Sequence, residues 1–259
     1  MKPSKGVILL MYSSGFKPFL VNILGNLSKT QKSNYDIRIL ASRHDVNALS
    51  SQFLEFPVSV QIDTSPAMDE LFDKTTPSHA FASREFNLLM VEKVTYIKKN
   101  LSLYKHVIYS DLDVAWLKNP IPYLRQINKK YPIAFQSEAQ SSSTPVLCFG
   151  FASFRSGILA KYFFGKILCL LRKSVKKGQI LPDQVILNQL YETSPWFRLM
   201  VFILPEALFP NGLSYRLMTT NVDDGRLEQI PSPFIFHSNF MIGLPNKAYF
   251  LEKYANWVF

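Results

Sequence analysis

Two carboxylates stand two residues apart in the segment His106–Pro120, His-Val-Ile-Tyr-Ser-Asp-Leu-Asp-Val-Ala-Trp-Leu-Lys-Asn-Pro. The apolar run before them, Val107–Tyr109, is typical of a buried strand. Ligands of open α/β sheets bind just beyond the carboxyl ends of strands, and residues i and i+2 of an extended chain point the same way. Asp111 and Asp113 are therefore candidates to hold one hard divalent cation. The alternative is a solvated turn with two acids, which the apolar start of Trp116–Pro120 does not suit.

A second candidate group lies near the end of the chain. Apolar Phe234–Phe236 predicts a strand that delivers His237, and Gly243 and Lys247 follow at loop spacing. A neutral imidazole can complete a coordination shell begun by two carboxylates. Backbone N–H groups near a small residue, together with a lysine, can cradle a phosphate. A lone histidine after an apolar strand is more often a satisfied core residue, so both interpretations stay open here.

The elements that must position these residues follow an α/β pattern. The first half alternates strands and helices, which predicts a mostly parallel sheet. The expected strands are Gly6–Tyr12, Ile37–Ala41, Val58–Ile62 and Val107–Tyr109, the expected helices include Lys17–Leu27 and Ser83–Leu101, and Thr64–Ser78 is expected to be a loop. No repeat or linker divides the chain, so we expect a single domain over its 259 residues.

The second half predicts shorter strands and longer helices. The expected strands are Ile133–Phe135, Leu147–Phe154 and Leu199–Leu204, the expected helices are Ile158–Leu171, one that begins at Pro182, and Pro245–Trp257, and Ser137–Pro145 is expected to be a polar loop. Asp183 and Gln184 fall in a helix first turn, where an acid suits the helix dipole.

Two further positions admit a functional and an ordinary interpretation. Lys93 falls close to the apolar face of its helix, where it either meets a phosphate or, more commonly, snorkels to the surface. The turn Ser13-Ser14-Gly15 joins a strand to a helix, as in nucleotide-binding domains. It lacks the full Gly-x-Gly-x-x-Gly pattern, so a dinucleotide fold is not supported and an ordinary β-α turn is favoured.

Composition narrows the class of protein. Hydrophobic residues make up 47% of the chain and aromatic residues 14%, which is typical of a globular protein. The formal charge of +10 favours an anionic substrate or polyanionic partner, or else reflects a merely soluble surface. No nucleic-acid motif accompanies the basic residues. Cys148 and Cys169 are the only cysteines, and they either form one bridge or are buried thiols.

The motifs together resemble the nucleotide-diphospho-sugar transferase domain of GT-A glycosyltransferases. The resemblance is to the retaining family that holds plant rhamnogalacturonan xylosyltransferases and related α-galactosyltransferases. It rests on segments that fall in the same order: Val107–Pro120, Gly150–Arg155, Asp183–Asn188 (Asp-Gln-Val-Ile-Leu-Asn), Phe209–Gly212 and Ile235–Lys247. It implies an open, mixed, mostly parallel sheet flanked by helices, with a nucleotide-binding half near residues 1–120 and an acceptor and metal-completing half near 121–259.

The resemblance also implies roles for the candidate residues. Asp111, Asp113 and His237 would hold Mn²⁺ or Mg²⁺ against the diphosphate of a UDP-sugar. The remaining donor-site candidates are Tyr12, Ser13 and Ser14 near the uridine, Lys93, and Gly243 and Lys247 at the diphosphate. Asp183 and Gln184 would face the reacting sugar as the catalytic pair. Xylose or galactose would pass to a hydroxyl of a glycan or glycoprotein acceptor.

Two other functions compete with this one. A metal-dependent phosphohydrolase could use the same acids and histidine, although such enzymes often need a second dense acid cluster. A non-catalytic basic module for nucleic acid or an anionic membrane would have no need of Asp111. The sequence shows no transmembrane segment or signal-peptide core. We therefore expect the Golgi lumen if an N-terminal anchor is missing from this chain, and the cytoplasm if the chain is complete.

Overall fold

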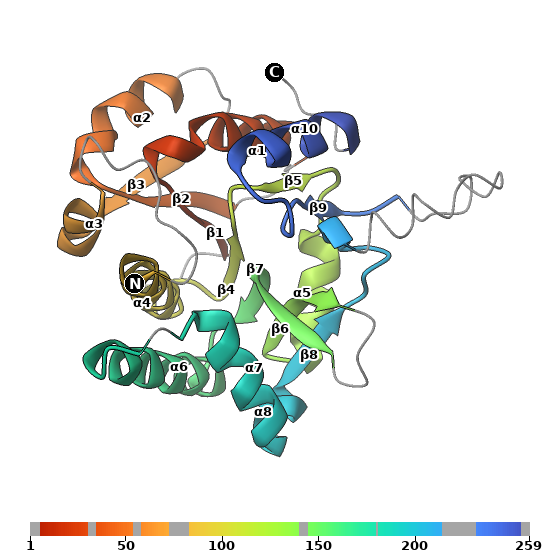
Figure 1. Cartoon of the computed structure of the whole chain (residues 1–259). Helices are drawn as coiled ribbons and strands as arrows, with labels where there is room; N and C mark the ends of the chain where they lie inside the picture. The colour runs from red at the N-terminus through yellow and green to blue at the C-terminus, as the bar shows by residue number, and fades with distance from the viewer. Residues whose placement is uncertain are drawn as a thin grey trace.

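The computed structural model describes residues 6–30, 35–53, 58–72, 83–139, 145–179, 181–213 and 232–254. Its centre is a seven-stranded sheet of order β3-β2-β1-β4-β7-β6-β8, beside which lies a two-stranded pair, β5–β9 (Figure 1). The strands are β1 (Gly6–Met11), β2 (Tyr35–Ala41), β3 (Val60–Thr64), β4 (His106–Ser110), β5 (Val114–Trp116), β6 (Ile133–Ala139), β7 (Val146–Arg155), β8 (Val201–Leu204) and β9 (Ile235–His237).

The sheet is mixed because one strand runs against its neighbours. The pairs β1–β2, β2–β3, β1–β4 and β6–β8 are parallel, whereas β7 is antiparallel to both β4 and β6. The expectation of an open, mostly parallel sheet in a single α/β domain is confirmed.

Helices cover both faces of this sheet. They are α1 (Lys17–Thr30), α2 (Val46–Phe53), α3 (Pro66–Leu71), α4 (Arg84–Asn100), α5 (Ile121–Lys130), α6 (Ile158–Lys176), α7 (Asp183–Thr193), α8 (Pro195–Met200) and α10 (Leu244–Tyr254), with short 3-10 turns η1 (Ser14–Phe16) and η2 (Arg43–Asp45). Figure 1 shows α1, α10 and the β5–β9 pair on one side of the sheet, and α4 and α6 on the other.

Alternation along the strands explains why two layers of helices are needed. In β1, Val7 and Leu9 join the core beneath α4 and α6, whereas Ile8 and Leu10 join the core beneath α1 and α5. Successive side chains of a strand point to opposite faces, so a strand that is apolar at every position must be covered on both sides. All four of these side chains are fully buried.

Several boundaries differ from the sequence-based expectation. Part of the predicted loop Thr64–Ser78 is helix α3, because Ser65 Oγ accepts a hydrogen bond from Met68 N (3.2 Å) and Pro66 starts the helix. The rest of that loop, from residue 73, lies outside the described residues, as do residues 140–144 of the predicted polar loop and residues 255–257 of the predicted last helix.

Two further expectations were wrong in the second half. The predicted strand Leu199–Leu204 starts only at Val201, because Pro195 begins α8 and buries Phe197 and Met200, three residues apart. The predicted loop Ser137–Pro145 begins inside β6, where Ser137 Oγ donates to Glu206 Oε1 (2.7 Å).

Neither cysteine is bridged. Cys148 is a buried free thiol, as one expectation had it, but Cys169 is exposed on α6. In the part of the chain that the structure describes, no helix is both long and apolar enough to cross a bilayer.

Candidate active site

The candidate residues gather at one edge of the sheet. β1 and β4 are parallel neighbours in which Leu9 pairs with Tyr109, so both strands end at this edge. β7 runs the opposite way and brings its early residues there, where Asp111 N donates to Gly150 O (2.7 Å). We call this the carboxyl edge, because β1 and β4 end there.

The acid pair lies in a turn, not in the extended chain that the sequence suggested. Asp111 follows the last residue of β4, and Asp113 precedes β5. The chain turns here because β5 leaves the main sheet to pair with β9, with Val114 opposite His237. Ser238 N and Oγ both donate to Asp113 O, at 3.0 and 3.1 Å, and tie the two segments together. This pairing delivers a histidine from the end of the chain to the acids.

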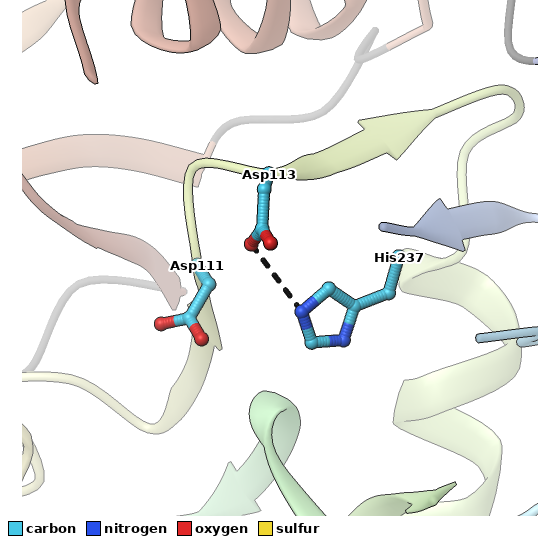
Figure 2. Close-up of side chains that lie close together, drawn as sticks. All are labelled: Asp111, Asp113 and His237. Carbon is cyan, nitrogen blue, oxygen red and sulfur yellow. Dashed lines mark ion pairs between the residues drawn. The ribbon is translucent and has the colours of Figure 1, made fainter. Parts of the chain in front are cut away.

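Three side chains converge at the centre of this edge. Figure 2 shows Asp113 and His237 facing each other, from the β4–β5 turn and from β9, with Asp111 beside them in the same turn. One ligand atom from each lies within 4.8 Å of the others, and His237 Nε2 lies 3.3 Å from Asp113 Oδ1. Two carboxylates and an imidazole form a donor set suited to Mn²⁺ or a similar divalent cation.

The second ring nitrogen of His237 is held from behind. Nδ1 lies 2.8 Å from the Gln136 Oε1 acceptor, so Nδ1 carries a proton, and whenever the ring loses its second proton the Nε2 lone pair faces the acids. Gln136 is itself fixed, because its Nε2 donates to the carbonyl oxygens of Phe209 and Pro210, each at 3.0 Å. An outer partner that orients a ligating histidine in this way is usual in protein metal sites.

Gly150 leaves the room that this cluster needs. A Cβ at this position would overlap the His237 ring and lie 2.7 Å from Asp111 Oδ2. A glycine inside a strand often marks a close approach of other groups, and here two candidate ligands press against the bare backbone.

The charged groups of the cluster shift one another's pKa values. Burial works to raise the pKa of Asp113, but Lys247 and His237 overcome it and hold that pKa below its usual range. Burial raises the pKa of Asp111, and the Asp113 charge adds to this, whereas Lys93 and His237 oppose it. Burial works to lower the pKa of His237, but Asp113 raises it to about 10. The two carboxylates therefore favour a positively charged group beside them.

Lys247 supplies positive charge from α10. Its Nζ forms an ion pair with Asp113 Oδ2. Gly243 immediately precedes α10 with φ of 84°, a backbone conformation that favours glycine, and Lys247 N donates to Gly243 O (3.2 Å). The predicted glycine and lysine thus lie at the first turn of a helix whose lysine reaches the acid pair.

Lys93 does not snorkel to the surface, which corrects the commoner expectation. Only 3% of the residue is exposed, and its Nζ pairs with Asp183 Oδ2 at 3.0 Å. The ammonium also lies over the rings of Tyr109 (4.7 Å) and Phe149 (4.4 Å). A buried acid that lies far away in the sequence compensates the lysine charge, and the helix pattern alone could not reveal it.

The start of α7 lies beside the same edge. Gln184 Nε2 donates to Glu138 Oε2 of β6, and Phe149 N donates to Gln184 Oε1 (3.4 Å). The amide of Asn188 exchanges two hydrogen bonds with the Leu147 backbone, at 2.8 and 3.0 Å, and anchors α7 on β7. The Asp-Gln-Val-Ile-Leu-Asn motif therefore places Asp183 against Lys93 and Gln184 against an acid.

The first turn lies at the same edge, since β1 adjoins β4. Tyr12 and Ser13 are buried, Ser14 is exposed, and Tyr12 N donates to Leu40 O (2.8 Å). Burial, with the nearby Asp45, raises the pKa of Tyr12 to about 12. The structure puts these three residues next to the acid turn along the edge, and their role toward a nucleotide stays a prediction.

Sequence reasoning missed three residues of this site. Gln136 and Glu138 fall in or beside a stretch that resembled a polar loop, and Gly150 was noted only as the start of a motif. One local signal was available, because a glycine within an apolar strand indicates close packing against the backbone. For Gln136 and Glu138 no local signal exists, since their partners are His237 and Gln184.

Comparisons with known proteins agree with this geometry. Residues 55–251 match the family model described as nucleotide-diphospho-sugar transferase. The chain is 26% identical over 276 residues to UDP-D-xylose:L-fucose alpha-1,3-D-xylosyltransferase 3 of Arabidopsis thaliana, covering 97% of this chain and 66% of the relative. It is 22% identical over 281 residues to the UDP-galactose:fucoside alpha-3-galactosyltransferase of Dictyostelium discoideum, covering 96% and 42%. The chain thus spans under two thirds of the length of these two relatives.

Solved structures share the fold at low sequence identity. Mouse xyloside xylosyltransferase 1 superposes with a TM-score of 0.60 at 12% identity, over 93% of this chain and all of that one. The galactosyltransferase LgtC, solved with donor and acceptor sugar analogues, gives a TM-score of 0.61 at 12% identity, over 90% and 87%. The GT-A-like fold implied by the motifs is confirmed, and the match to the family model spans most of the chain. This chain belongs to the nucleotide-diphospho-sugar transferase family.

Proposed function

We propose that this chain transfers a sugar from a UDP-sugar to a hydroxyl group of a glycan or glycoprotein, in a reaction that depends on Mn²⁺ or Mg²⁺. The observation that carries the proposal is the convergence of Asp111, Asp113 and His237 with Lys247 at the carboxyl edge. Ligands of open α/β sheets bind at this edge, and the family to which the chain belongs uses nucleotide-diphospho-sugars.

The residues present fit a divalent cation. Asp111 and Asp113 offer hard oxygen donors, and Gln136 keeps His237 Nε2 available as a nitrogen donor. Gly150 keeps the space beside them clear of any side chain. When bound, the cation would stabilise the negative charge that grows on the departing diphosphate.

Lys247 would share that task from the first turn of α10. Its ammonium already lies at the acid pair, and the backbone N–H groups that begin the helix offer donors to phosphate oxygens. Burial works to lower the pKa of Lys247, but Asp113 raises it above its ordinary value, so the side chain stays charged. We assign Lys247 and Gly243 to the diphosphate, and Tyr12, Ser13 and Ser14 to the nucleoside end of the donor.

The start of α7 would hold the sugar. The Gln184 amide is partly exposed and contacts Glu138, so both polar groups can bind sugar hydroxyls or support charge at the anomeric carbon. Asp183 is neutralised by Lys93 in the core. We therefore assign Gln184 to the sugar, and Asp183 and Lys93 to positioning the start of α7 and supporting Asp111. We propose as well that residues up to about 120 bind the nucleotide and the rest complete the metal site and bind the acceptor.

The named relatives point to a donor and a stereochemical outcome. Three are UDP-D-xylose:L-fucose alpha-1,3-D-xylosyltransferases, and one is a UDP-galactose:fucoside alpha-3-galactosyltransferase. UDP-xylose and UDP-galactose carry the sugar in α linkage, so an α product means retention. We propose xylose or galactose as the sugar, with retention, and a fucose-bearing glycan as the first acceptor to test.

A phosphohydrolase is less well supported. Such enzymes often use two metal ions and correspondingly more carboxylates. Among the described residues, Asp111, Asp113 and His237 form the single cluster that could hold a metal.

A donor panel tests the proposal. Purified protein is incubated with UDP-xylose, UDP-galactose or UDP-glucose and methyl α-L-fucoside, with Mn²⁺ or with EDTA. We expect UDP release and an α-linked disaccharide, identified by NMR, with one donor only when Mn²⁺ is present. Equal turnover in EDTA would overturn metal dependence, and a β-linked product would overturn retention. Hydrolysis of simple phosphate esters without glycoside formation would favour the phosphohydrolase.

A further inference from the structure

Large apolar side chains are exposed together on two helices. Ile158, Leu159 and Tyr162 of α6 are 87%, 52% and 64% exposed, and Trp196 and Leu199 of α8 are 77% and 71% exposed. These five make up half of the large apolar side chains that are exposed in the described part of the chain. We call them the basal patch. Exposed apolar side chains that gather on two packed helices often mark an interaction site.

A buried contact holds the two helices of the basal patch together. Phe163 of α6 and Phe197 of α8 meet edge to face, with ring centroids 4.9 Å apart. Phe163 follows Tyr162 in the chain, and Phe197 follows Trp196. The exposed Tyr162 and Trp196 are therefore each next in sequence to one of the two rings that join α6 to α8. Figure 1 shows α6 and α8 at the same end of the molecule.

The basal patch lies away from the active site. β7 starts near the acids and ends with Arg155 opposite His106, the first residue of β4, and α6 begins three residues later. α7 begins beside the site at Asp183 and runs 11 residues, about 16 Å, before α8 starts. A surface that covered the patch would leave the carboxyl edge open.

Positive charge surrounds the patch. Lys105, Arg155 and Lys161 line a shallow hollow beside the start of α6, and Arg198 is exposed within α8. From Lys98 to Leu181 the chain carries 14 Lys and Arg residues but only three acids, all of which lie at the active site. The nearest exposed acid along α7 is Glu192. Within this segment, α6 itself carries five Lys and Arg residues and no acid.

We propose that the basal patch docks on the surface of a bilayer that contains anionic lipids. Trp and Tyr suit the headgroup level of a membrane, Ile and Leu suit the acyl boundary, and Lys and Arg suit anionic headgroups. Two copies of this chain would bring like charges together at the same patch, which disfavours self-association. Nucleic acid would leave the exposed aliphatic side chains without apolar partners. Docked in this way, the enzyme would present its carboxyl edge away from the membrane.

Vesicle co-sedimentation tests this proposal without any donor or metal. The chain is mixed with phosphatidylcholine vesicles, with or without phosphatidylserine at about a third of the lipid. We expect binding only to the anionic vesicles, and weakening as salt is raised. The paired changes Trp196→Glu and Leu199→Glu should lower the partition coefficient at least tenfold. The pair Lys161→Glu and Arg198→Glu should lower it by more than tenfold, since each basic residue near such a surface contributes roughly fivefold.

Tyr249→Glu is the matched control, because Tyr249 is 63% exposed on α10, on the other side of the sheet. It should bind like the parent. All the changed positions are exposed, so the melting temperature of every variant should stay near that of the parent.

The proposal is overturned if the parent binds neither vesicle, or if the patch variants bind as well as Tyr249→Glu. It is also overturned if light scattering shows that the parent is a dimer and that the patch variants are monomers. That result would make the patch an interface between copies of this chain. UDP-sugar turnover with soluble substrates should be unchanged in every variant, so failure here says nothing against the proposed function.

Discussion

Two buried histidines lie toward opposite ends of the central strands and differ in charge, because His106 is neutral and His237 is protonated. His106 begins β4, far from the acids, and is 6% exposed. His237 ends β9 at the carboxyl edge and is 3% exposed. Burial alone therefore does not decide the charge of a histidine in this protein. What decides it is the set of groups that each ring contacts.

The contacts of His106 are uncharged. Its Nδ1 lies 2.6 Å from Tyr35 Oη, and its Nε2 lies 2.7 Å from Asn128 Oδ1 and 2.8 Å from Ser153 Oγ. Burial lowers the pKa of His106 to about 4, and nearby Arg125 adds to this, while the Asn128 hydrogen bond opposes it. The ring is neutral at physiological pH and serves to join β2, β4, α5 and β7.

The contacts of His237 are charged, and they reverse the outcome. Without a cation, the proton on His237 and the ammonium of Lys247 neutralise Asp113. The carboxyl edge thus attracts positive charge from two side chains at once, which is what a divalent cation and a lysine would supply to a diphosphate. The comparison shows that charged side chains converge at the carboxyl edge. At the other end of the strands, the buried histidine contacts only uncharged groups.

The largest expected effect is on activity and comes from neutralising Asp113. Asp113→Asn keeps the shape of the side chain but removes the charge that attracts both cations. Loss of one strong electrostatic contact to a transition state costs about 2.7–4 kcal/mol, or roughly 10²–10³ in rate, and loss of the metal should cost at least that. Sugar transfer by the purified variant, measured well below its melting temperature, checks this.

Asp63→Asn is the control for that variant. Asp63 also accepts charged hydrogen bonds, from Arg38 Nε at 2.7 Å, but it lies on β3 outside the site. Both variants should melt at a lower temperature than the parent, because each leaves a cation without its partner. Only Asp113→Asn should lose transfer. Activity of Asp113→Asn within about tenfold of the parent would contradict the assignment.

The second effect is on metal affinity and separates the two histidines directly. His237→Gln should weaken Mn²⁺ binding at least tenfold, whereas His106→Gln should leave it unchanged, as measured by calorimetric titration. Gln136→Met should weaken binding by about 10–100-fold, the range typical of lost outer partners of a metal ligand. If His106→Gln weakened Mn²⁺ binding as much as His237→Gln, the proposal that only His237 belongs to the metal site would be wrong.

The third effect is on stability and depends on pH. In the folded protein the pKa of His106 is about 4, below its ordinary value of 6.5, so only the unfolded chain takes up this proton between those pH values. The unfolded state is therefore favoured as pH falls from 6.5 toward 4, by up to about 1.4 kcal/mol per pH unit.

Chemical denaturation of the parent and of His106→Gln at several pH values isolates this contribution. The stability advantage of the parent should be greatest above pH 6.5 and should shrink toward pH 4. A constant difference across this window would mean that His106 does not have a lowered pKa in the folded state.

Some elements and site residues could be predicted from the sequence because they leave local signals in it. The apolar strands β1 and β4, helix α4 with its Ser83 cap, and the acids at the end of β4 all leave local signals. Ser83 Oγ accepts from Phe86 N at 3.0 Å and so caps the first turn of α4. His237 was expected as a third candidate ligand because an apolar strand delivers it, and the structure brings it to the acids.

The remaining site residues depend on which strands become neighbours. β7 inserts antiparallel between β4 and β6, and only this order carries Gly150 to Asp111 and Gln136 to His237. Nothing near Gln136 or Glu138 in the sequence encodes that order. Lys93 illustrates the same limit, since a lysine at the border of an apolar helix face usually reaches solvent, and a buried acid far along the chain keeps this one inside.

The most direct measurement is the melting temperature of the parent and of Asp113→Asn with UDP, with Mn²⁺, and with both. If Asp111, Asp113 and His237 hold a cation against a nucleoside diphosphate, UDP stabilises the parent only in the presence of Mn²⁺. The gain should be about 2.7 kcal/mol when UDP is at about 100 times its dissociation constant. Asp113→Asn should show no such gain. An unchanged parent melting temperature with millimolar UDP and Mn²⁺, or equal stabilisation without the metal, would contradict the account.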